Sequence, residues 1–186
     1  MKLNLGCGNK LLPGFINVDH WVGCNPDRVL DIAEDGLAPF ADCSIDEVIA
    51  EHVLEHIGPE PAKFLRLMRE LYRVMKPGAL LKIAVPHPRT DNFIADPEHV
   101  RPILPLTMRL FSRRALEHAV ASGNTTTTPF ALRLGVDFEM TKLSFSLMGG
   151  WADAKRNGRI PAEELDLAIE SGWNVVNEIR MELLRI

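Results

Sequence analysis

The chain has few of the residues that mark disulfide scaffolds, zinc clusters or membrane spans. Its 186 residues include three cysteines, Cys7, Cys24 and Cys43, with no Cys-x-x-Cys spacing. An odd and widely spaced set of this kind predicts free thiols and no zinc cluster. No apolar run approaches the roughly 18 residues that would cross a bilayer, so we expect no membrane span.

An excess of positive charge is also missing, and the first residues do not have the pattern of a leader segment. With 25 acidic residues against 21 basic ones the formal charge is -4, so strong nonspecific binding to nucleic acid is not expected. The first six residues, MKLNLG, contain no apolar stretch of the signal-peptide kind, which makes the cytoplasm the default expectation. A chain of this length buries roughly 70% of its unfolded surface around one core, so we expect a single domain over residues 1–186.

Short apolar runs rich in valine, isoleucine and leucine alternate with helical or turn-like segments. This order is typical of an α/β domain whose parallel strands are buried on both faces of the sheet. The predicted strands span residues 2–5, 15–18, 28–30, 47–50 and 80–85. The clearest predicted helix spans residues 61–75, because four apolar or aromatic residues recur there at three- and four-residue spacing: Leu65, Met68, Tyr72 and Met75.

The C-terminal part of the sequence shows a different strand pattern. Residues 138–147 alternate with a phase shift at Thr141 and Lys142, which predicts a strand with a bulge. Residues 178–184 alternate strictly, as in a half-exposed antiparallel edge strand. A helix within residues 163–169 is predicted to separate this strand pair. Another predicted helix begins at Ser112, ends at Gly123 and precedes a threonine-rich loop over residues 124–129.

Two features near the N-terminus predict a nucleoside site. The first strand runs into a turn with Gly6 and Gly8, and Asp19 closes the second strand, where its carboxylate can accept hydrogen bonds from both ribose hydroxyls. A dinucleotide site would need a third glycine where Leu11 stands and a helix aimed at the pyrophosphate. S-adenosylmethionine has no phosphate and fits this short element better, which disfavours a nicotinamide-dependent oxidoreductase.

Four segments, residues 3–8, 14–19, 51–57 and 71–79, together resemble class I S-adenosylmethionine-dependent methyltransferases. An Asp-Pro-x-His stretch after the fifth strand resembles that of some sugar- and lipid-modifying relatives. The resemblance implies a Rossmann-like, mostly parallel seven-stranded sheet with an antiparallel C-terminal strand pair and helices on both faces. It divides the domain into a cofactor-binding half, residues 1–86, and an acceptor-side insertion with the C-terminal strands, residues 87–186.

The resemblance also implies roles for individual residues. The glycine turn would lie under the methionine part of S-adenosylmethionine, Asp19 would bind the ribose, Asp31 and Ile32 would lie near the adenine, and Glu51 and His52 would line the methionine side. Hydrogen bonds that fix the loop are an equal alternative role for His52. The predicted cofactor-binding set is Asn4, Gly6, Cys7, Gly8, Asp19, His20, Asp31, Ile32, Glu51 and His52.

The acceptor side is predicted around His87, Asp91, Asp96 and His99, because these residues follow the fifth strand at the same edge of the sheet. They could act as a base, hold a metal or staple their own loop, and their spacing matches no known metal site, so no metal is assigned. The implied reaction is methyl transfer to an oxygen or nitrogen of a small-molecule or glycan-like acceptor. The alternative is a catalytically silent, methyltransferase-like scaffold subunit.

The sequence departs from this family pattern near its start. Relatives often have a capping helix before the first strand, whereas almost no chain precedes it here, and the first crossover is unusually short. Both departures would leave the cofactor more exposed unless another segment or another subunit covers it. A homo-oligomer is therefore a possible arrangement.

Overall fold

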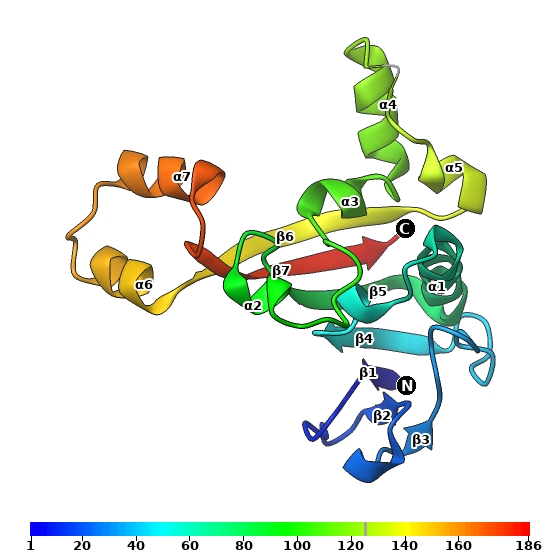
Figure 1. Cartoon of the computed structure of the whole chain (residues 1–186). Helices are drawn as coiled ribbons and strands as arrows, with labels where there is room; N and C mark the ends of the chain where they lie inside the picture. The colour runs from blue at the N-terminus through cyan, green and yellow to red at the C-terminus, as the bar shows by residue number, and fades with distance from the viewer. Residues whose placement is uncertain (125) are drawn as a thin grey trace.

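The protein is built on one seven-stranded sheet (Figure 1). The computed structural model describes residues 1–124 and 126–186, so Thr125, in the predicted threonine-rich loop, lies outside the described residues. The strand order is β3-β2-β1-β4-β5-β7-β6. The strands are β1 (Lys2–Leu5), β2 (Ile16–Asp19), β3 (Arg28–Val29), β4 (Ile45–Glu51), β5 (Met75–Pro86), β6 (Phe138–Leu147) and β7 (Val176–Arg185).

The first five strands run parallel, and β7 pairs antiparallel with both β5 and β6, which confirms the predicted mostly parallel sheet with a C-terminal antiparallel pair. None of the described helices is both long and apolar enough to cross a membrane. The helices are α1 (Pro61–Val74), α2 (Asp91–Ile94), α3 (Pro105–Arg109), α4 (Arg113–Ala121), α5 (Phe130–Leu134), α6 (Gly149–Arg156) and α7 (Ala162–Ser171), with the short 3-10 turns η1 (Val22–Cys24) and η2 (Leu54–His56).

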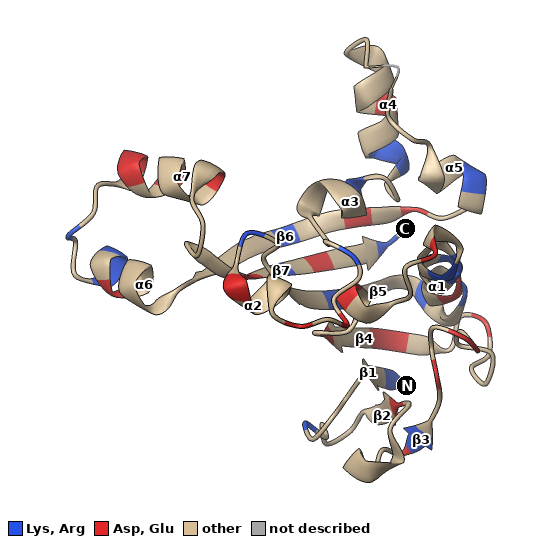
Figure 2. Ribbon diagram, in the orientation of Figure 1, with Lys and Arg blue, Asp and Glu red and all other residues tan. Residues whose placement is uncertain are grey.

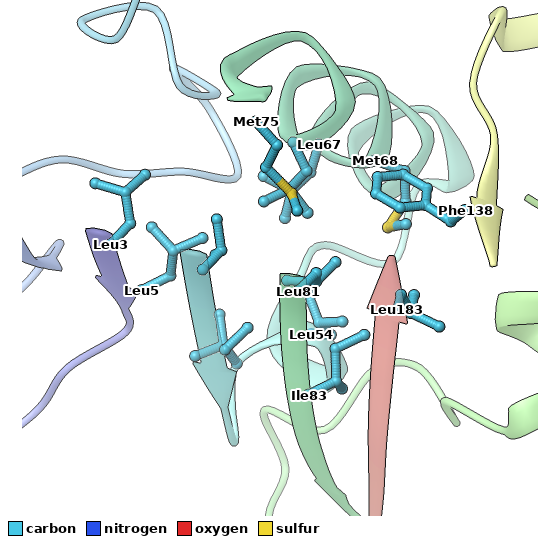
Figure 3. Close-up of a cluster of buried hydrophobic side chains, with 14 of the residues drawn as sticks. Leu3, Leu5, Leu54, Leu67, Met68, Met75, Leu81, Ile83, Phe138 and Leu183 are labelled. Carbon is cyan, nitrogen blue, oxygen red and sulfur yellow. The ribbon is translucent and has the colours of Figure 1, made fainter. Parts of the chain in front are cut away.

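Helix α1 packs on one face of the sheet and forms the core with it (Figure 3). Pro61 occupies its first turn, where a missing N–H costs nothing. The buried face of α1 differs slightly from the predicted apolar stripe, because Leu67, Met68 and Leu71 are fully buried and Tyr72 is only partly buried. Below the helix, one buried residue from each of four strands stands in register across the sheet: Leu3, Val48, Leu81 and Leu183.

The opposite face of the sheet is polar, which corrects the prediction that the parallel strands are buried on both faces. Glu47 lies between Lys2, at 2.8 Å, and Lys82, at 2.6 Å. On the neighbouring strands Lys142 pairs with Glu182 at 3.3 Å, and Figure 2 shows charged positions along β4, β5 and β7. The connections from β1 to β2 and from β2 to β3 contain no α-helix, so these crossovers bring no helix onto this face.

The C-terminal strand pair confirms the predicted bulge and corrects the prediction of which strand lies at the edge of the sheet. The register between β6 and β7 skips Thr141, as the phase shift predicts. Ile179, Met181 and Leu183 are buried, so the alternation of β7 is also as predicted. However, β7 lies between β5 and β6, and the edge strand is β6, whose Phe145 is 40% exposed. The second predicted helix begins as expected, because the Ser112 hydroxyl accepts a hydrogen bond from the Ala115 N–H at 3.1 Å.

Candidate active site

The predicted cofactor residues gather at the carboxyl edge of the parallel strands. Gly6 and Gly8 follow β1, Asp19 ends β2, Asp31 follows β3, and Glu51 ends β4. Parallel strands bring the segments after them to one edge, which is where ligands bind in open α/β sheets. The topology therefore places these residues on the side where a nucleoside would lie.

The two glycines of the first turn have different surroundings. Gly6 has φ +58°, and a Cβ there would lie 2.2 Å from Cγ2 of Val53. Gly8 has φ +46°, and a Cβ there would meet nothing within 4 Å. Gly6 is therefore required by packing against the loop after β4. Gly8 instead presents its backbone to open space, as a turn that receives a ligand must.

Asp19 ties this turn to the end of β2. One carboxylate oxygen accepts the Gly8 N–H at 2.8 Å and the other accepts the Trp21 N–H at 2.9 Å. The residue is 8% exposed, and its neighbour His20 is exposed with Nδ1 3.5 Å from the carboxylate. Each oxygen of a carboxylate can accept more than one hydrogen bond, so Asp19 retains acceptor capacity for a diol.

Asn4 lies beneath the turn and helps to hold the short crossover. Its side-chain amide donates to the Asn17 side chain at 2.9 Å and to the Lys10 carbonyl at 2.8 Å. Asn17 in turn donates to Asp27 at 2.8 Å. This network, buried at Asn4 and Asn17 and exposed at Asp27, holds a crossover that contains no α-helix. Asn17 and Asp27 were missed by sequence reasoning, because neither belongs to the glycine motif.

Cys7 packs inside the turn. Its N–H donates to the Val18 carbonyl at 3.0 Å, and its side chain is buried beside Cys24. Burial, and secondarily the neighbouring Cys24 thiol, raises the pKa of Cys7 to about 11. A thiol held protonated in this way is a packing group and a poor nucleophile.

The residues predicted to lie near the adenine, Asp31 and Ile32, sit in a tight turn after β3. The exposed Asp31 accepts hydrogen bonds from the N–H groups of Ala33, at 2.9 Å, and Glu34, at 3.2 Å. Ile32 is buried in the core cluster. Asp31 thus shapes the turn with one oxygen, Oδ1, while its other oxygen accepts no hydrogen bond from the described residues.

His52 follows β4 in a strained backbone conformation, with φ +54°. Its Nε2 lies 2.8 Å from Glu178 and its Nδ1 lies 3.5 Å from Glu55. These two carboxylates, Glu55 foremost, raise the pKa of His52 above its ordinary value. Non-glycine residues with positive φ occur often at functional sites, where surrounding contacts hold them in place.

Glu51 forms the other half of this edge. Its carboxylate accepts a hydrogen bond from Lys10 and lies 3.4 Å from Arg180. The ammonium group of Lys10 lowers the pKa of Glu51, so this residue is an anion at neutral pH. Lys10 and Arg180 therefore pair with a carboxylate that is predicted to line the methionine side of the cofactor site.

The first two predicted acceptor-side residues, His87 and Asp91, have separate hydrogen-bond partners. His87 is 7% exposed, its Nδ1 accepts the Arg89 N–H at 3.2 Å, and burial lowers its pKa. The nearby Asp91 accepts hydrogen bonds from Trp173 and Asn174, both at 2.7 Å. Asp91 thus attaches the start of the insertion to the segment before β7.

His99 and Asp96 lie close to each other, with Nε2 of His99 3.7 Å from the Asp96 carboxylate. His99 also contacts His56, and their ring centroids are 4.7 Å apart. Among the described residues, no hydrogen bond or ion pair joins His99 to His87. Of the four predicted residues, the structure therefore brings Asp96 and His99 together.

Three residues at this edge were not selected by sequence reasoning as site residues: Glu55, His56 and Glu178. Glu55 and His56 belong to the segment 51–57 that carries the family resemblance, so their motif was the available signal. Glu178 reaches His52 from β7, 126 positions along the chain, and no local pattern reveals that contact.

Residues 3–83 match the family model described as a methyltransferase domain. The match covers β1 to β4, α1 and most of β5, which is less than half of the chain. The family match and the fold together support a class I S-adenosylmethionine-dependent methyltransferase with that cofactor. The Asp-Pro-x-His stretch at residues 96–99 lies outside the matched residues.

Solved structures share the fold at low sequence identity. An S-adenosylmethionine-dependent methyltransferase from Archaeoglobus fulgidus is 19% identical, with a TM-score of 0.65 over 98% of this chain and 85% of that one. Another from Mesorhizobium loti is 17% identical, with a TM-score of 0.53 over 100% and 90%. The [4+2]-cyclase SpnF is 16% identical, with a TM-score of 0.51 over 98% and 74%. The search of curated proteins finds no match.

Proposed function

We propose that this methyltransferase transfers the methyl group of S-adenosylmethionine to an oxygen or nitrogen of a small-molecule or glycan-like acceptor. The observation that carries the proposal is the joint placement of Gly8 and Asp19: open space above Gly8 and a carboxylate bonded to the same turn. When bound, S-adenosylmethionine supplies an electrophilic methyl group on a sulfonium.

The residues of the chain then have binding and orienting roles. Asp19 accepts the ribose hydroxyls, the turn from Gly6 to Gly8 receives the methionine part, and the turn at Asp31 and Ile32 adjoins the adenine. Glu51 and His52, at the end of β4, line the methionine side. These roles follow the family resemblance and agree with the positions of the residues at one sheet edge.

The acceptor side in this proposal is the insertion after β5. Backbone hydrogen bonds attach it to the same edge: the N–H groups of Val100 and Arg101 donate to the Glu55 carbonyl, at 3.0 and 3.2 Å. His87, Asp91, Asp96 and His99 belong to this insertion. Because an in-line displacement needs chiefly alignment and exclusion of water, a positioning role for the insertion is sufficient for catalysis.

Calorimetry with S-adenosylmethionine and S-adenosylhomocysteine tests the cofactor site. Asp19→Ala should weaken binding at least tenfold, since each hydrogen bond to a charged group contributes about 1.5–3 kcal/mol. Asp166→Ala, an exposed carboxylate on α7, is the matched control and should bind as the parent protein does. Undiminished binding by Asp19→Ala, or no binding by the parent at millimolar cofactor, would contradict the proposal.

Isotopically labelled cofactor incubated with a cell extract tests transfer and identifies the acceptor by mass spectrometry. Loss of labelling in His87→Ala or His99→Ala, with cofactor binding retained, supports the acceptor-side assignment. Cofactor binding without labelling of any molecule would favour the alternative of a scaffold subunit. The fold alone does not decide between them, because one fold hosts several activities.

A further inference from the structure

Three side chains from two loops converge at the carboxyl edge of the sheet. Glu55 and His56 belong to η2, which follows β4, and His99 lies in the segment after α2. One ligand atom from each residue lies within 4.8 Å of the other two. The rings of His56 and His99 meet edge to face, with an interplanar angle of 62°.

Glu55 is the member of this cluster that indicates a ligand. Its side chain is fully buried, and within the described part of the chain neither carboxylate oxygen has a hydrogen-bond partner. The nearest charged group is the half-exposed ring of His52, whose Nδ1 lies 3.5 Å from Oε1 without a hydrogen bond. A buried carboxylate without hydrogen-bond partners is strongly disfavoured, and a bound cation would compensate it.

His99 is already oriented as a metal ligand. Its Nδ1 must donate to the Phe93 carbonyl, 2.9 Å away, because a carbonyl oxygen can only accept, and this leaves Nε2 with a free lone pair. Histidines that bind metals usually donate their other ring N–H to a carbonyl or carboxylate. The ring of Phe93 also stacks on His99, with centroids 5.2 Å apart, and limits its rotation.

A second carboxylate stands beside the free nitrogen. Oδ2 of Asp96 lies 3.7 Å from Nε2 of His99, while Oδ1 of Asp96 accepts the Glu98 N–H at 2.8 Å. The site thus offers two imidazoles, one buried carboxylate and one half-buried carboxylate. This donor set suits zinc and its divalent neighbours, whose preferred ligands are imidazole nitrogen and carboxylate oxygen.

We propose that Glu55, His56 and His99 bind a divalent transition-metal ion such as zinc. Ligand atoms around a tetrahedral zinc, at about 2.0–2.2 Å from the ion, lie roughly 3.3 Å from one another, so small side-chain rotations close the cluster. The ion would fasten the acceptor-side insertion to the loop after β4, where backbone bonds already join Val100 and Arg101 to Glu55. This site goes beyond the proposed methyl transfer and is measured independently of it.

Titration of the untagged full chain with Zn²⁺ or Co²⁺ tests the proposal. We expect one ion per chain, with affinity lowered roughly 100-fold or more in Glu55→Gln and His99→Ala. His118→Ala, an exposed histidine on α4, is the matched control and should bind as the parent does. Equal binding by all four proteins, or no binding by the parent, would overturn the assignment.

The visible spectrum of the Co²⁺ protein distinguishes this site from the other cluster of ligand-type residues, Cys7, Asp19 and Cys24. Nitrogen and oxygen ligation should give no thiolate-to-cobalt band in the near ultraviolet. Such a band would show that the cysteines bind the ion and would overturn the proposal. Melting curves without metal show whether each variant folds. In a folded His99→Ala protein, Zn²⁺ should no longer raise Tm, and a retained rise would contradict the site.

Discussion

Gly6 and Val53 lie so close that position 6 has no room for a side chain, since a Cβ there would stand 2.2 Å from Cγ2 of Val53. Gly8, two residues on, has nearly the same positive φ but open space around it. The same turn therefore contains one glycine required by packing and one that keeps space free.

Gly6→Ala should lower the free energy of unfolding by about 2–5 kcal/mol, from about 1–2 kcal/mol of left-handed strain and about 1–3 kcal/mol of overpacking. Gly8→Ala should destabilise the fold only by the left-handed strain, and its main effect should be weaker cofactor binding. Thermal melts and calorimetry separate the two effects. In a Val53→Ala background Gly6→Ala should cost less, and an unchanged cost would show that the contact is not the cause.

Arg73 fastens the loop between β3 and β4 to helix α1. Its guanidinium donates to the carbonyls of Phe40, at 2.9 Å, and Leu37, at 3.1 Å, and to Glu70 at 2.7 and 2.8 Å. Arg73→Lys should destabilise the protein by about 1.5–3 kcal/mol, because a lysine cannot reproduce the planar set of donors. Urea unfolding measures this, and Arg69→Lys, on the exposed side of the same helix, should change stability little.

The cysteines should differ sharply in reactivity. With a pKa of about 11, Cys7 has roughly one thiolate in a thousand molecules at pH 8, whereas Cys43 is exposed. Iodoacetamide at pH 8 should modify Cys43 and leave Cys7 intact, as read by peptide mass spectrometry. Modification of Cys7 at a comparable rate in the folded protein would contradict the buried turn, and unfolding in urea should abolish the difference.

Much of the fold follows from local patterns. The residues that form the row from Leu3 to Leu183 were predictable, because period-two alternation and buried apolar runs follow directly from the sequence. The bulge at Thr141 was predictable for the same reason, since one extra residue shifts the alternation. The position of β7 between β5 and β6 was not, because pairing partners depend on contacts between distant segments.

The site was predictable only where its residues share a motif. Asp19 follows the glycine turn by a short, recognisable interval, so its contact with Gly8 could be anticipated. The contact of His52 with Glu178 joins strands far apart in sequence, and the convergence of Glu55 with His99 depends on how the insertion folds back. Polar residues on the open face of the sheet, such as Glu47, were missed for another reason. The α/β pattern assumes crossover helices that cover both faces of the sheet, and the short crossovers do not supply them.

Glu47 should make stability depend on pH through its two lysines. Hydrogen bonds from Lys2 and Lys82 lower its pKa below the ordinary 4.5, so the stabilisation is present above that value and is lost as the pH falls through the lowered pKa of the folded state. Glu47→Gln should lose about 0.2–1 kcal/mol per pair at pH 7 and match the parent once Glu47 is protonated. Urea unfolding across this range measures the difference, with the exposed Glu117→Gln as control. Because partly exposed pairs are screened by ions, 1 M salt should shrink the difference at pH 7, and a salt-independent loss would indicate that packing, not charge, holds this face of the sheet.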